Sequence, residues 1–251
     1  MMKLTLVSIL ISFNASLALA ALPHPKGKSG VTYKTFFGQC PAKSSGMLGL
    51  MIMKEFEKAK SLKDVKEKML HEKLDEKFFL SDYRISFNPV SQTLRINLEC
   101  PEPMAKVQVY KLNGEEHFSA ILSSNGKMYE PQYEILMSSE KKLTYQLPLI
   151  ALSIDQVEGG APQELTDTIQ KLNMDMRKRI SEIILSKKNE LTIIFSLGGK
   201  ATSVFMGADF WDEKLYKLTK VVGYVSKSQR YPSSINLTNP KKVVVKFSDK
   251  I

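Results

Sequence analysis

Apolar and polar residues alternate along two neighbouring segments, 83–87 and 94–98, which are separated by the dipeptide Asn88-Pro89. Alternation with a period of two places every second side chain on the same face of a β-strand. Asn and Pro are residues that favour turns, because of their side-chain hydrogen bonding and fixed φ respectively. The two segments therefore predict a β-hairpin with one buried face.

Three further elements are predicted ahead of this hairpin. A short strand spans 31–37 and is ended by Gly38 and Pro41. A dense apolar run over 46–60 predicts a largely buried helix. A second helix is expected to begin at Ser61, whose hydroxyl can accept a hydrogen bond from the first turn. The order strand, helix, helix, strand, strand predicts a compact α+β unit.

The chain beyond this unit consists of short apolar segments joined by turn dipeptides. These dipeptides tolerate the positive φ of tight hairpins, and they are Asn113-Gly114, Asn125-Gly126 and Gly198-Gly199. The last apolar segment, 243–247, has high β propensity. We therefore expect a β-rich, mostly antiparallel second domain that closes with a strand near the C-terminus.

Two long amphipathic helices are predicted to interrupt the second domain. The first begins near Pro162 and carries apolar residues at spacings of three and four, namely Leu165, Ile169, Leu172, Met176, Ile180 and Ile183. The second, which Asp209 can cap, carries one apolar stripe, namely Trp211, Leu215, Leu218, Val222 and Val225. We expect both stripes to cover a face of the sheet.

The first residues have the layout of an export signal. An apolar run from Leu4 to Leu22 follows Lys3, and the small residues at 18–20 suit a cleavage site. Because the run is nearly long enough to cross a bilayer, an uncleaved signal anchor is the alternative. The predicted segments are a signal peptide or anchor over 1–20, a linker over 21–30, and folded domains over 31–107 and 108–251.

Export changes how the cysteines and the charge are interpreted. In an oxidising compartment Cys40 and Cys100 form either one disulfide or two buried free thiols. The formal net charge of +10 is spread along the chain without an interleaved aromatic stripe. This charge fits an anionic membrane surface or an acidic partner better than nucleic acid.

The sequence shows no pattern typical of a catalytic or cofactor site. The three histidines have no metal-ligand spacing, and they are His24, His71 and His117. A nucleophile elbow and a phosphate-binding glycine loop are also missing from the sequence. The acidic residues Asp209, Asp212 and Glu213 are explained by capping and by the dipole of a helix N-terminus. We expect neither enzyme activity nor a cofactor, with a cell-envelope hydrolase as the weaker alternative.

An ordered series of motifs resembles a known family. The first unit ends with Leu94-Arg95-Ile96-Asn97-Leu98-Glu99 and then Pro103-Met104-Ala105. The second half contains, in order, Asn125-Gly126-Lys127-Met128-Tyr129, Leu147-Pro148, Phe205-Met206-Gly207, Glu213-Lys214-Leu215 with Leu218, Ile235-Asn236-Leu237 and the 243–247 segment. In this order the chain resembles the FtsQ/DivIB family of bacterial cell-division proteins, which combine a POTRA domain with a β domain. It differs in having only three residues before the apolar run and in having Asn236 where Asp is usual.

The resemblance implies a non-catalytic scaffold of the divisome on the periplasmic side of the inner membrane. It implies that the C-terminal part of the β domain binds FtsB-like and FtsL-like membrane proteins during septation. The exposed edge of a terminal strand can add a partner's strand. The predicted partner-binding residues are Asn239, Lys241, Lys242, Val243, Val244, Val245, Lys246 and Phe247.

Alternation within this strand predicts how it is used. Val243, Val245 and Phe247 are expected on the core face, and Val244 and Lys246 on the opposite face. The lysines of the segment are expected to attract an acidic partner.

A POTRA domain also places its first strand beside its last. Both strands are followed by a cysteine, so the resemblance predicts a Cys40–Cys100 disulfide. The alternative function for a POTRA-containing chain is assistance in outer-membrane protein assembly or secretion.

Overall fold

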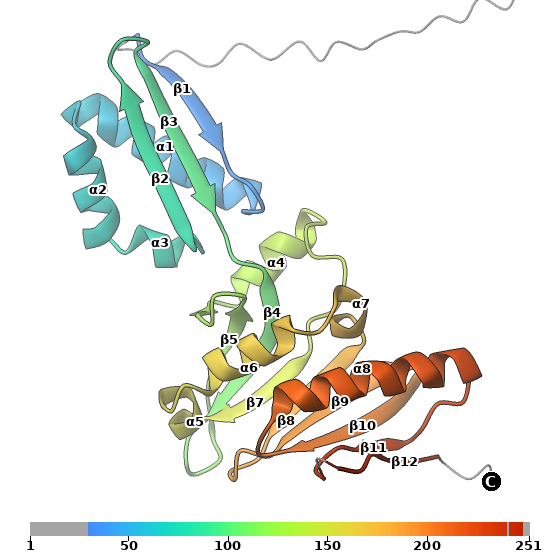
Figure 1. Cartoon of the computed structure of the whole chain (residues 1–251). Coiled ribbons are helices and arrows are strands. Elements are labelled where there is room, and N and C mark those ends of the chain that lie inside the picture. The colour runs from blue at the N-terminus through green and yellow to red at the C-terminus, as the bar shows by residue number, and fades with distance from the viewer. Residues whose placement is uncertain (1–29, 240, 248–251) are drawn as a thin grey trace, which may run out of the picture.

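The computed structural model describes residues 30–239 and 241–247, which form two units arranged end to end (Figure 1). The elements of the N-terminal unit are β1 (Thr32–Phe36), α1 (Ala42–Ala59), α2 (Leu62–His71), α3 (Leu74–Lys77), β2 (Asp82–Asn88) and β3 (Thr93–Glu99). Its sheet has the strand order β1-β3-β2, in which β3 is parallel to β1 and antiparallel to β2. The predicted β-α-α-β-β order is confirmed, with the short α3 added.

The N-terminal unit has a core of its own between its helices and its sheet. Leu48 and Ile52 of α1 are buried with Ile96 and Leu98 of β3 in one apolar cluster. The Ser61 hydroxyl accepts a hydrogen bond from the Asp64 N–H at 3.4 Å, as predicted for the start of α2. The hairpin of β2 and β3 is also as predicted, with its two strands in antiparallel register.

The second unit is one large sheet with helices. Its elements are β4 (Pro103–Tyr110), β5 (Glu116–Ser123), β6 (Met128–Tyr129), α4 (Gln132–Ser139), β7 (Leu149–Ser153), α5 (Ile154–Glu158), α6 (Ala161–Gln170), α7 (Met174–Arg177), β8 (Ile180–Leu185), β9 (Leu191–Leu197), β10 (Lys200–Gly207), α8 (Trp211–Ser228), β11 (Ser234–Asn236) and β12 (Val244–Lys246). The nine strands lie in the order β12-β11-β10-β9-β8-β7-β4-β5-β6. The fold is therefore α+β, as predicted.

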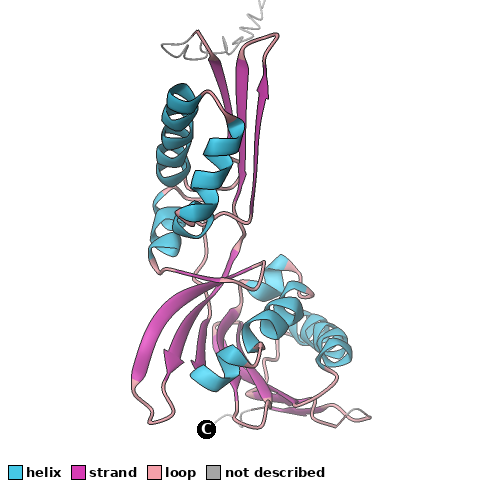
Figure 2. Cartoon of the chain, turned by 90° about the vertical axis from the view of Figure 1, so that its left-hand side faces the viewer, coloured by secondary structure: helices cyan, strands magenta, loops and turns pink. Residues whose placement is uncertain are grey.

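The large sheet is mixed and is covered by its long helices on one side (Figure 2). The pairs β4–β7, β7–β8 and β10–β11 are parallel, and the other neighbouring strands are antiparallel. The three predicted turn dipeptides join β4 to β5, β5 to β6 and β9 to β10. The apolar stripes of α6 and α8 both belong to the core cluster on the sheet, as predicted for helices that cover it.

The first of the two predicted long helices is wrong in its second half. α6 ends at Gln170, Asn173 caps the short α7 through a hydrogen bond from the Met176 N–H to its Oδ1 at 2.9 Å, and Ile180 begins the strand β8. The register of β8 against β9 shifts between Ile180 and Glu182. A β-bulge of this kind adds one residue between two neighbouring core-facing residues, so that Ile180 and Ile183 are three positions apart. The same spacing occurs on one face of a helix.

The predicted domain boundary after residue 107 also differs from the structure. β4 begins at Pro103 and belongs to the large sheet, so the chain passes from one sheet to the other at residues 100–102. The predicted signal segment 1–20, and all of the predicted linker except residue 30, lie outside the described residues. None of the helices described has the length and apolar character needed to cross a membrane.

Cys40 and Cys100 are joined by a disulfide, with their Cα atoms 5.0 Å apart. Because β1 and β3 are parallel neighbours, the segments that follow them leave the small sheet at the same end. Each of those segments carries one of the two cysteines. Such a bond is consistent with a location outside the cytoplasm.

An aromatic cluster joins the loop before β2 to the second unit. The ring of Phe79 is stacked on that of Tyr133 with centroids 4.8 Å apart. The Tyr129 hydroxyl donates to the Leu80 carbonyl at 3.1 Å, and the Tyr133 hydroxyl donates to the Pro101 carbonyl. Burial raises the pKa of the Tyr133 hydroxyl well above its ordinary value, which favours the protonated form that donates the hydrogen bond.

A second set of contacts, called the clasp here, joins the loop after β1 to the loop after α4. The Glu140 carboxylate accepts hydrogen bonds from the N–H groups of Ala42 at 2.7 Å and Lys43 at 3.2 Å. Lys142 donates to the Cys40 carbonyl and lies 3.1 Å from Glu140. Burial acts to raise the pKa of Glu140, but the hydrogen bonds from Ala42, Lys142 and Lys43 hold it below its ordinary value. A residue of the second unit thus caps a helix of the first.

Replacing Tyr133 with Phe tests how much the aromatic contact contributes to stability. The substitution keeps the stacked ring but leaves the Pro101 carbonyl without its donor. We expect the free energy of unfolding to fall by about 1–3 kcal/mol, the usual cost of an unsatisfied buried group. Denaturant unfolding followed by circular dichroism measures it. Tyr216→Phe is the control, because Tyr216 is 64% exposed, and an equal loss in both variants would contradict the assignment.

Candidate functional site

The strand β12 ends the large sheet at the side opposite β6. It is antiparallel to β11, with Ile235 opposite Val245, and no other described strand pairs with it. The Lys246 carbonyl points toward β11, because it accepts the Ser233 N–H at 2.9 Å. Backbone groups of successive residues in an edge strand point alternately to its two sides. The N–H and C=O of Val245 therefore face the free side of the sheet.

The side chains of this segment follow the predicted alternation in part. Val243 and Val245 are half-buried and pack against the core, while Val244 is 49% exposed and Lys246 is exposed. Phe247 corrects the prediction, because it is exposed rather than on the core face. The guanidinium of Arg230 lies over the Phe247 ring, 5.1 Å from its centroid. A cation in this position is attracted to the face of the ring and so stabilises Phe247 in its exposed place.

The turn before β12 is fixed by Asn239. Its side-chain oxygen accepts the Lys241 N–H at 2.9 Å, and its carbonyl accepts the Lys242 N–H at 3.3 Å. An Asn in this arrangement replaces backbone hydrogen bonds and sets the direction of the chain. Lys241 and Lys242 are exposed, whereas Pro240 of the predicted turn lies outside the described residues.

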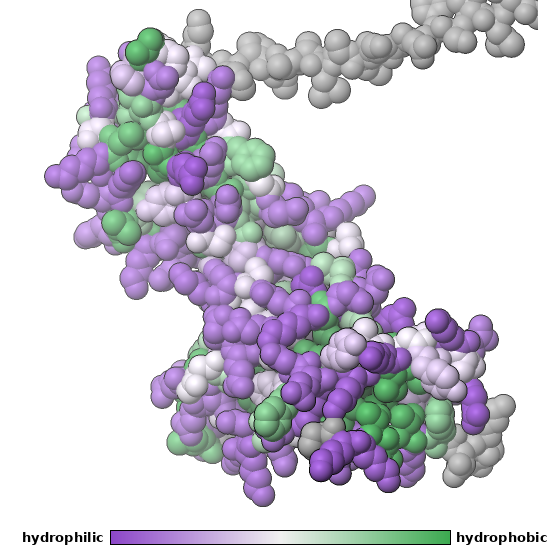
Figure 3. All heavy atoms as spheres, in the orientation of Figure 1, coloured by the Kyte–Doolittle hydropathy of each residue, from purple (hydrophilic) through white to green (hydrophobic). Residues whose placement is uncertain are grey.

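An apolar margin lies between α8 and the C-terminal strands. Val221 of α8 is part-buried against the same core cluster as Val243 and Val245. Figure 3 shows hydrophobic side chains gathered at the surface below α8, next to the C-terminal end of the described chain. A strand added beside β12 would lie next to this margin and could bury more of it.

A buried lysine holds α8 in place above β10 and β11. The Lys214 side chain is 1% exposed, and its Nζ donates to the carbonyls of Met206 at 2.7 Å and Asp209 at 2.6 Å. It also donates to the Asp209 carboxylate at 2.8 Å. This corrects the predicted role of Asp209, since the residue before α8 is Phe210 and no side chain caps the helix. Asp212 pairs instead with Lys171 at 2.5 Å.

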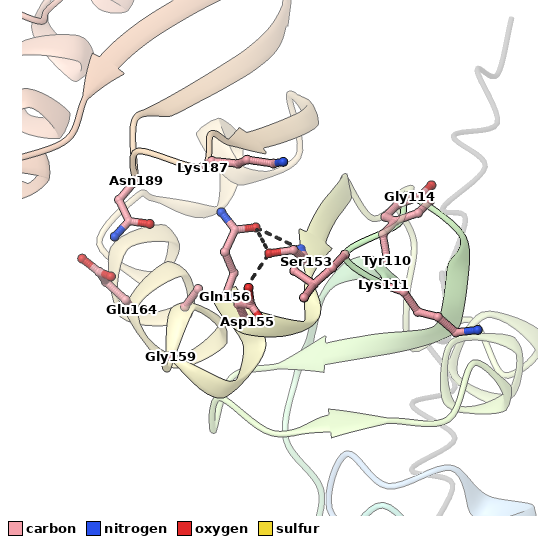
Figure 4. Close-up of a pocket in the computed structure, with 12 residues that line it drawn as sticks. Tyr110, Lys111, Gly114, Ser153, Asp155, Gln156, Gly159, Glu164, Lys187 and Asn189 are labelled. Atoms are coloured by element: carbon pink, nitrogen blue, oxygen red, sulfur yellow. Dashed lines mark hydrogen bonds between the residues drawn. The ribbon is translucent and has the colours of Figure 1, made fainter.

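A pocket of about 470 Å³ lies at the end of the large sheet where the strands β4 and β7 finish (Figure 4). Its lining includes Tyr110, Lys111, Gln156, Glu164 and Lys187. The Gln156 amide is already engaged, since it donates to the Leu185 and Ser186 carbonyls and accepts from Ser153.

The lining of this pocket brings cations and carboxylates together without a nucleophile and base in contact. Lys111, for example, is 3.3 Å from Glu115 outside the pocket. Among the residues that the structure describes, no group of three or more histidines, cysteines or carboxylates could hold a metal ion. The pocket offers no defined reaction chemistry, so the edge of β12 is the better candidate site.

Comparison with models of known protein families and with curated proteins found no match to this chain.

Several residues of this region and of the clasp were not identified from the sequence. Lys214 was noted only as part of a motif, and an apolar helix stripe next to a lysine gives no signal that the lysine is buried. Glu140 and Lys142 lie about 100 residues from the loop that they contact. Only Asn239, with its amide two residues before a lysine pair, carried a local signal for its turn.

Replacing Lys214 with Met tests its role as the support of α8. The substitution keeps the length of the side chain but leaves the Met206 carbonyl buried without a donor. We expect a loss of about 1–3 kcal/mol in the free energy of unfolding, measured by denaturant unfolding. The control is Lys227→Met on the exposed side of the same helix. If both variants are equally stable, the buried contacts of Lys214 contribute nothing.

Proposed function

We propose that this chain is a non-catalytic scaffold that binds a partner protein by β-strand addition at the free edge of β12. The observation that carries the proposal is the outer side of this strand, to which the Val245 backbone groups point and with which no other described strand pairs. An unpaired edge supplies a row of donors and acceptors at fixed spacing, which a second extended chain can satisfy.

The surroundings of the edge favour an amphipathic and acidic partner strand. One face of an added strand would meet the margin of the core, where Val243 and Val245 are half-buried. The neighbouring lysines Lys241 and Lys246 are exposed, and they would attract carboxylates at the encounter stage.

The resemblance to the FtsQ/DivIB family gives this scaffold a specific setting. In that setting the N-terminal unit is a POTRA domain, and the whole described part lies on the periplasmic side of the bacterial inner membrane, either held by the Leu4–Leu22 segment or released by cleavage after Ala20. The partners are then FtsB-like and FtsL-like division proteins. The strand order within the N-terminal unit and the terminal position of β12 support this proposal.

A second candidate is assistance in outer-membrane protein assembly or secretion, which the β-α-α-β-β unit also favours. The two functions differ in the partner bound. A division scaffold captures an FtsB–FtsL pair, whereas an assembly factor captures unfolded β-barrel segments. Binding measurements with both kinds of partner distinguish them.

Replacing Val245 with Pro tests strand addition directly. Proline removes the N–H that faces the free side and obstructs a neighbouring strand, while the backbone bonds of Val244 and Lys246 to β11 are retained. We expect the affinity for the periplasmic part of the FtsB–FtsL pair from the same organism to fall at least about tenfold, as for the loss of about 1.4 kcal/mol. Isothermal titration calorimetry measures it.

The control is Val245→Thr, which keeps both the N–H and the branched shape. Circular dichroism establishes that each variant is folded. A folded Val245→Pro protein that binds this pair as tightly as the unchanged protein would show that the free edge is not the binding site.

A triple replacement of Lys241, Lys242 and Lys246 with Gln tests the electrostatic contribution. We expect the association rate to fall about tenfold at low salt, because rim charges act mainly on the encounter. The difference in association rate between the variant and the unchanged protein should disappear at about 0.5 M salt, because charges more than a few ångströms apart are screened from each other there. Stopped-flow or surface plasmon resonance measures both rates.

The matched control removes three exposed lysines from the N-terminal unit, Lys63, Lys66 and Lys77. It changes the net charge equally but leaves the β12 edge intact. An equal fall in the rate for both triple variants would assign the effect to overall charge rather than to the edge.

A further inference from the structure

The disulfide lies within the contact between the two units. Cys40 is followed at once by the start of α1, whose first N–H groups at Ala42 and Lys43 bond to Glu140. The Cys40 carbonyl itself accepts from Lys142. Each hydrogen bond of the clasp that joins the two units therefore uses a backbone group at Cys40 or within three residues of it.

The loop that carries these groups is held by the disulfide and by short-range hydrogen bonds, from the Cys40 N–H to the Phe37 carbonyl and from Ser45 to the Pro41 carbonyl. It connects β1 to α1 over residues 37–41, and the disulfide fixes it to the segment that leaves β3. The first N–H groups of a helix have no acceptor within the helix. Their hydrogen bonds to Glu140 depend on the position of this loop, which the disulfide helps to set together with the packing of α1.

The aromatic cluster depends less directly on the disulfide, although Cys100 packs against it and the Tyr133 hydroxyl donates to the carbonyl of the neighbouring Pro101. Phe79 and Leu80 belong to the segment between α3 and β2, and they contact Tyr129 and Tyr133. Neither cysteine lies in that segment. Breaking the disulfide would consequently weaken the clasp more than the contacts that Phe79 and Leu80 make with Tyr133 and Tyr129.

The disulfide is also open to attack from one side. Cys40 is completely buried, whereas Cys100 is part-buried and lines a cavity of about 400 Å³ between the two units. Lys142, Lys178 and Glu102 line the same cavity, and Lys142 is paired with Glu140. The positive charge of Lys178 at this position attracts an incoming thiolate.

We propose that the Cys40–Cys100 disulfide is an exchangeable bond that locks the two units together, and that its reduction by a dithiol releases the clasp and leaves a hinge at the aromatic cluster. This proposal does not depend on the partner-binding role of β12. The reductant is a dithiol that can enter the cavity at Cys100, such as the reactive pair of a thiol–disulfide oxidoreductase.

The exchange balances as two displacements. A thiolate of the dithiol forms a bond to the Cys100 sulfur, and the Cys40 sulfur leaves with the electron pair as a thiolate. The second thiol of the reductant then displaces the Cys100 sulfur. In sum, two electrons and two protons pass to the cysteines, and the dithiol becomes a disulfide.

Dithiothreitol serves as the reductant in the test, and alkylation followed by mass spectrometry establishes that both cysteines have been reduced under native conditions. Hydrogen exchange then reports on the two sets of contacts separately. We expect exchange at the Ala42 and Lys43 amides to become at least ten times faster. Exchange in β3 and in the segment of Tyr129 and Tyr133 should change less than twofold. Small-angle X-ray scattering should show a broader distribution of distances.

Two variants separate the clasp from the bond that positions it. Glu140→Ala, with the disulfide intact, should produce the same fast exchange at Ala42 and Lys43, whereas the control Glu158→Ala, an exposed residue, should not. A Cys40→Ala/Cys100→Ala double variant should behave as the reduced protein does and should not respond to dithiothreitol.

Three results would overturn the proposal. The first is a disulfide that dithiothreitol reduces only after unfolding. The second is a reduced protein with unchanged exchange at Ala42 and Lys43 and unchanged scattering. The third is a reduced protein, or double variant, in which β3 also exchanges rapidly, because the disulfide would then hold the N-terminal unit folded instead of controlling a hinge.

Discussion

The parallel pairing of β1 with β3 is the constraint on which the arrangement of the two units depends. Parallel neighbours send the chain out at the same end of a sheet, so the segments after both strands arrive together. One of them leads into α1 and the other into β4. The start of α1, the disulfide and the entry to the second unit are consequently gathered at one place. An antiparallel β1 would have moved the helix N-terminus and Cys40 to the far end.

The thinning of the core toward its last strand explains why the large sheet has a free edge. Its long helices cover the strands from β4 to β11, and their apolar residues share one core with them. β12 adds only three residues and contributes one half-buried valine, Val245. The core therefore becomes thinner toward β12, and this strand keeps backbone groups on an outer side that no other described strand pairs with.

Local patterns predicted the elements better than the contacts between them. The hairpin of β2 and β3 and the cap at Ser61 depend on residues close in sequence, and both were predictable. Ile180 and Ile183 misled the assignment because a bulge brought two strand residues to a helical spacing. Asp209 precedes a helix like a cap, but the buried Lys214 competes for it. The pairing of Cys40 with Cys100 followed from a family resemblance, whereas the clasp of Glu140 with α1 joins residues too distant for any local pattern.

The lysines around β12 also affect whether two copies of the chain can pair with each other. A free strand edge can pair with the same edge of another copy, which is a common start of unwanted assembly. Here such a pair would bring Lys241, Lys242 and Lys246 of each copy together, and the repulsion of like charges at close range would oppose it. The basic edge thus disfavours homodimers while it remains open to an acidic strand of a different protein.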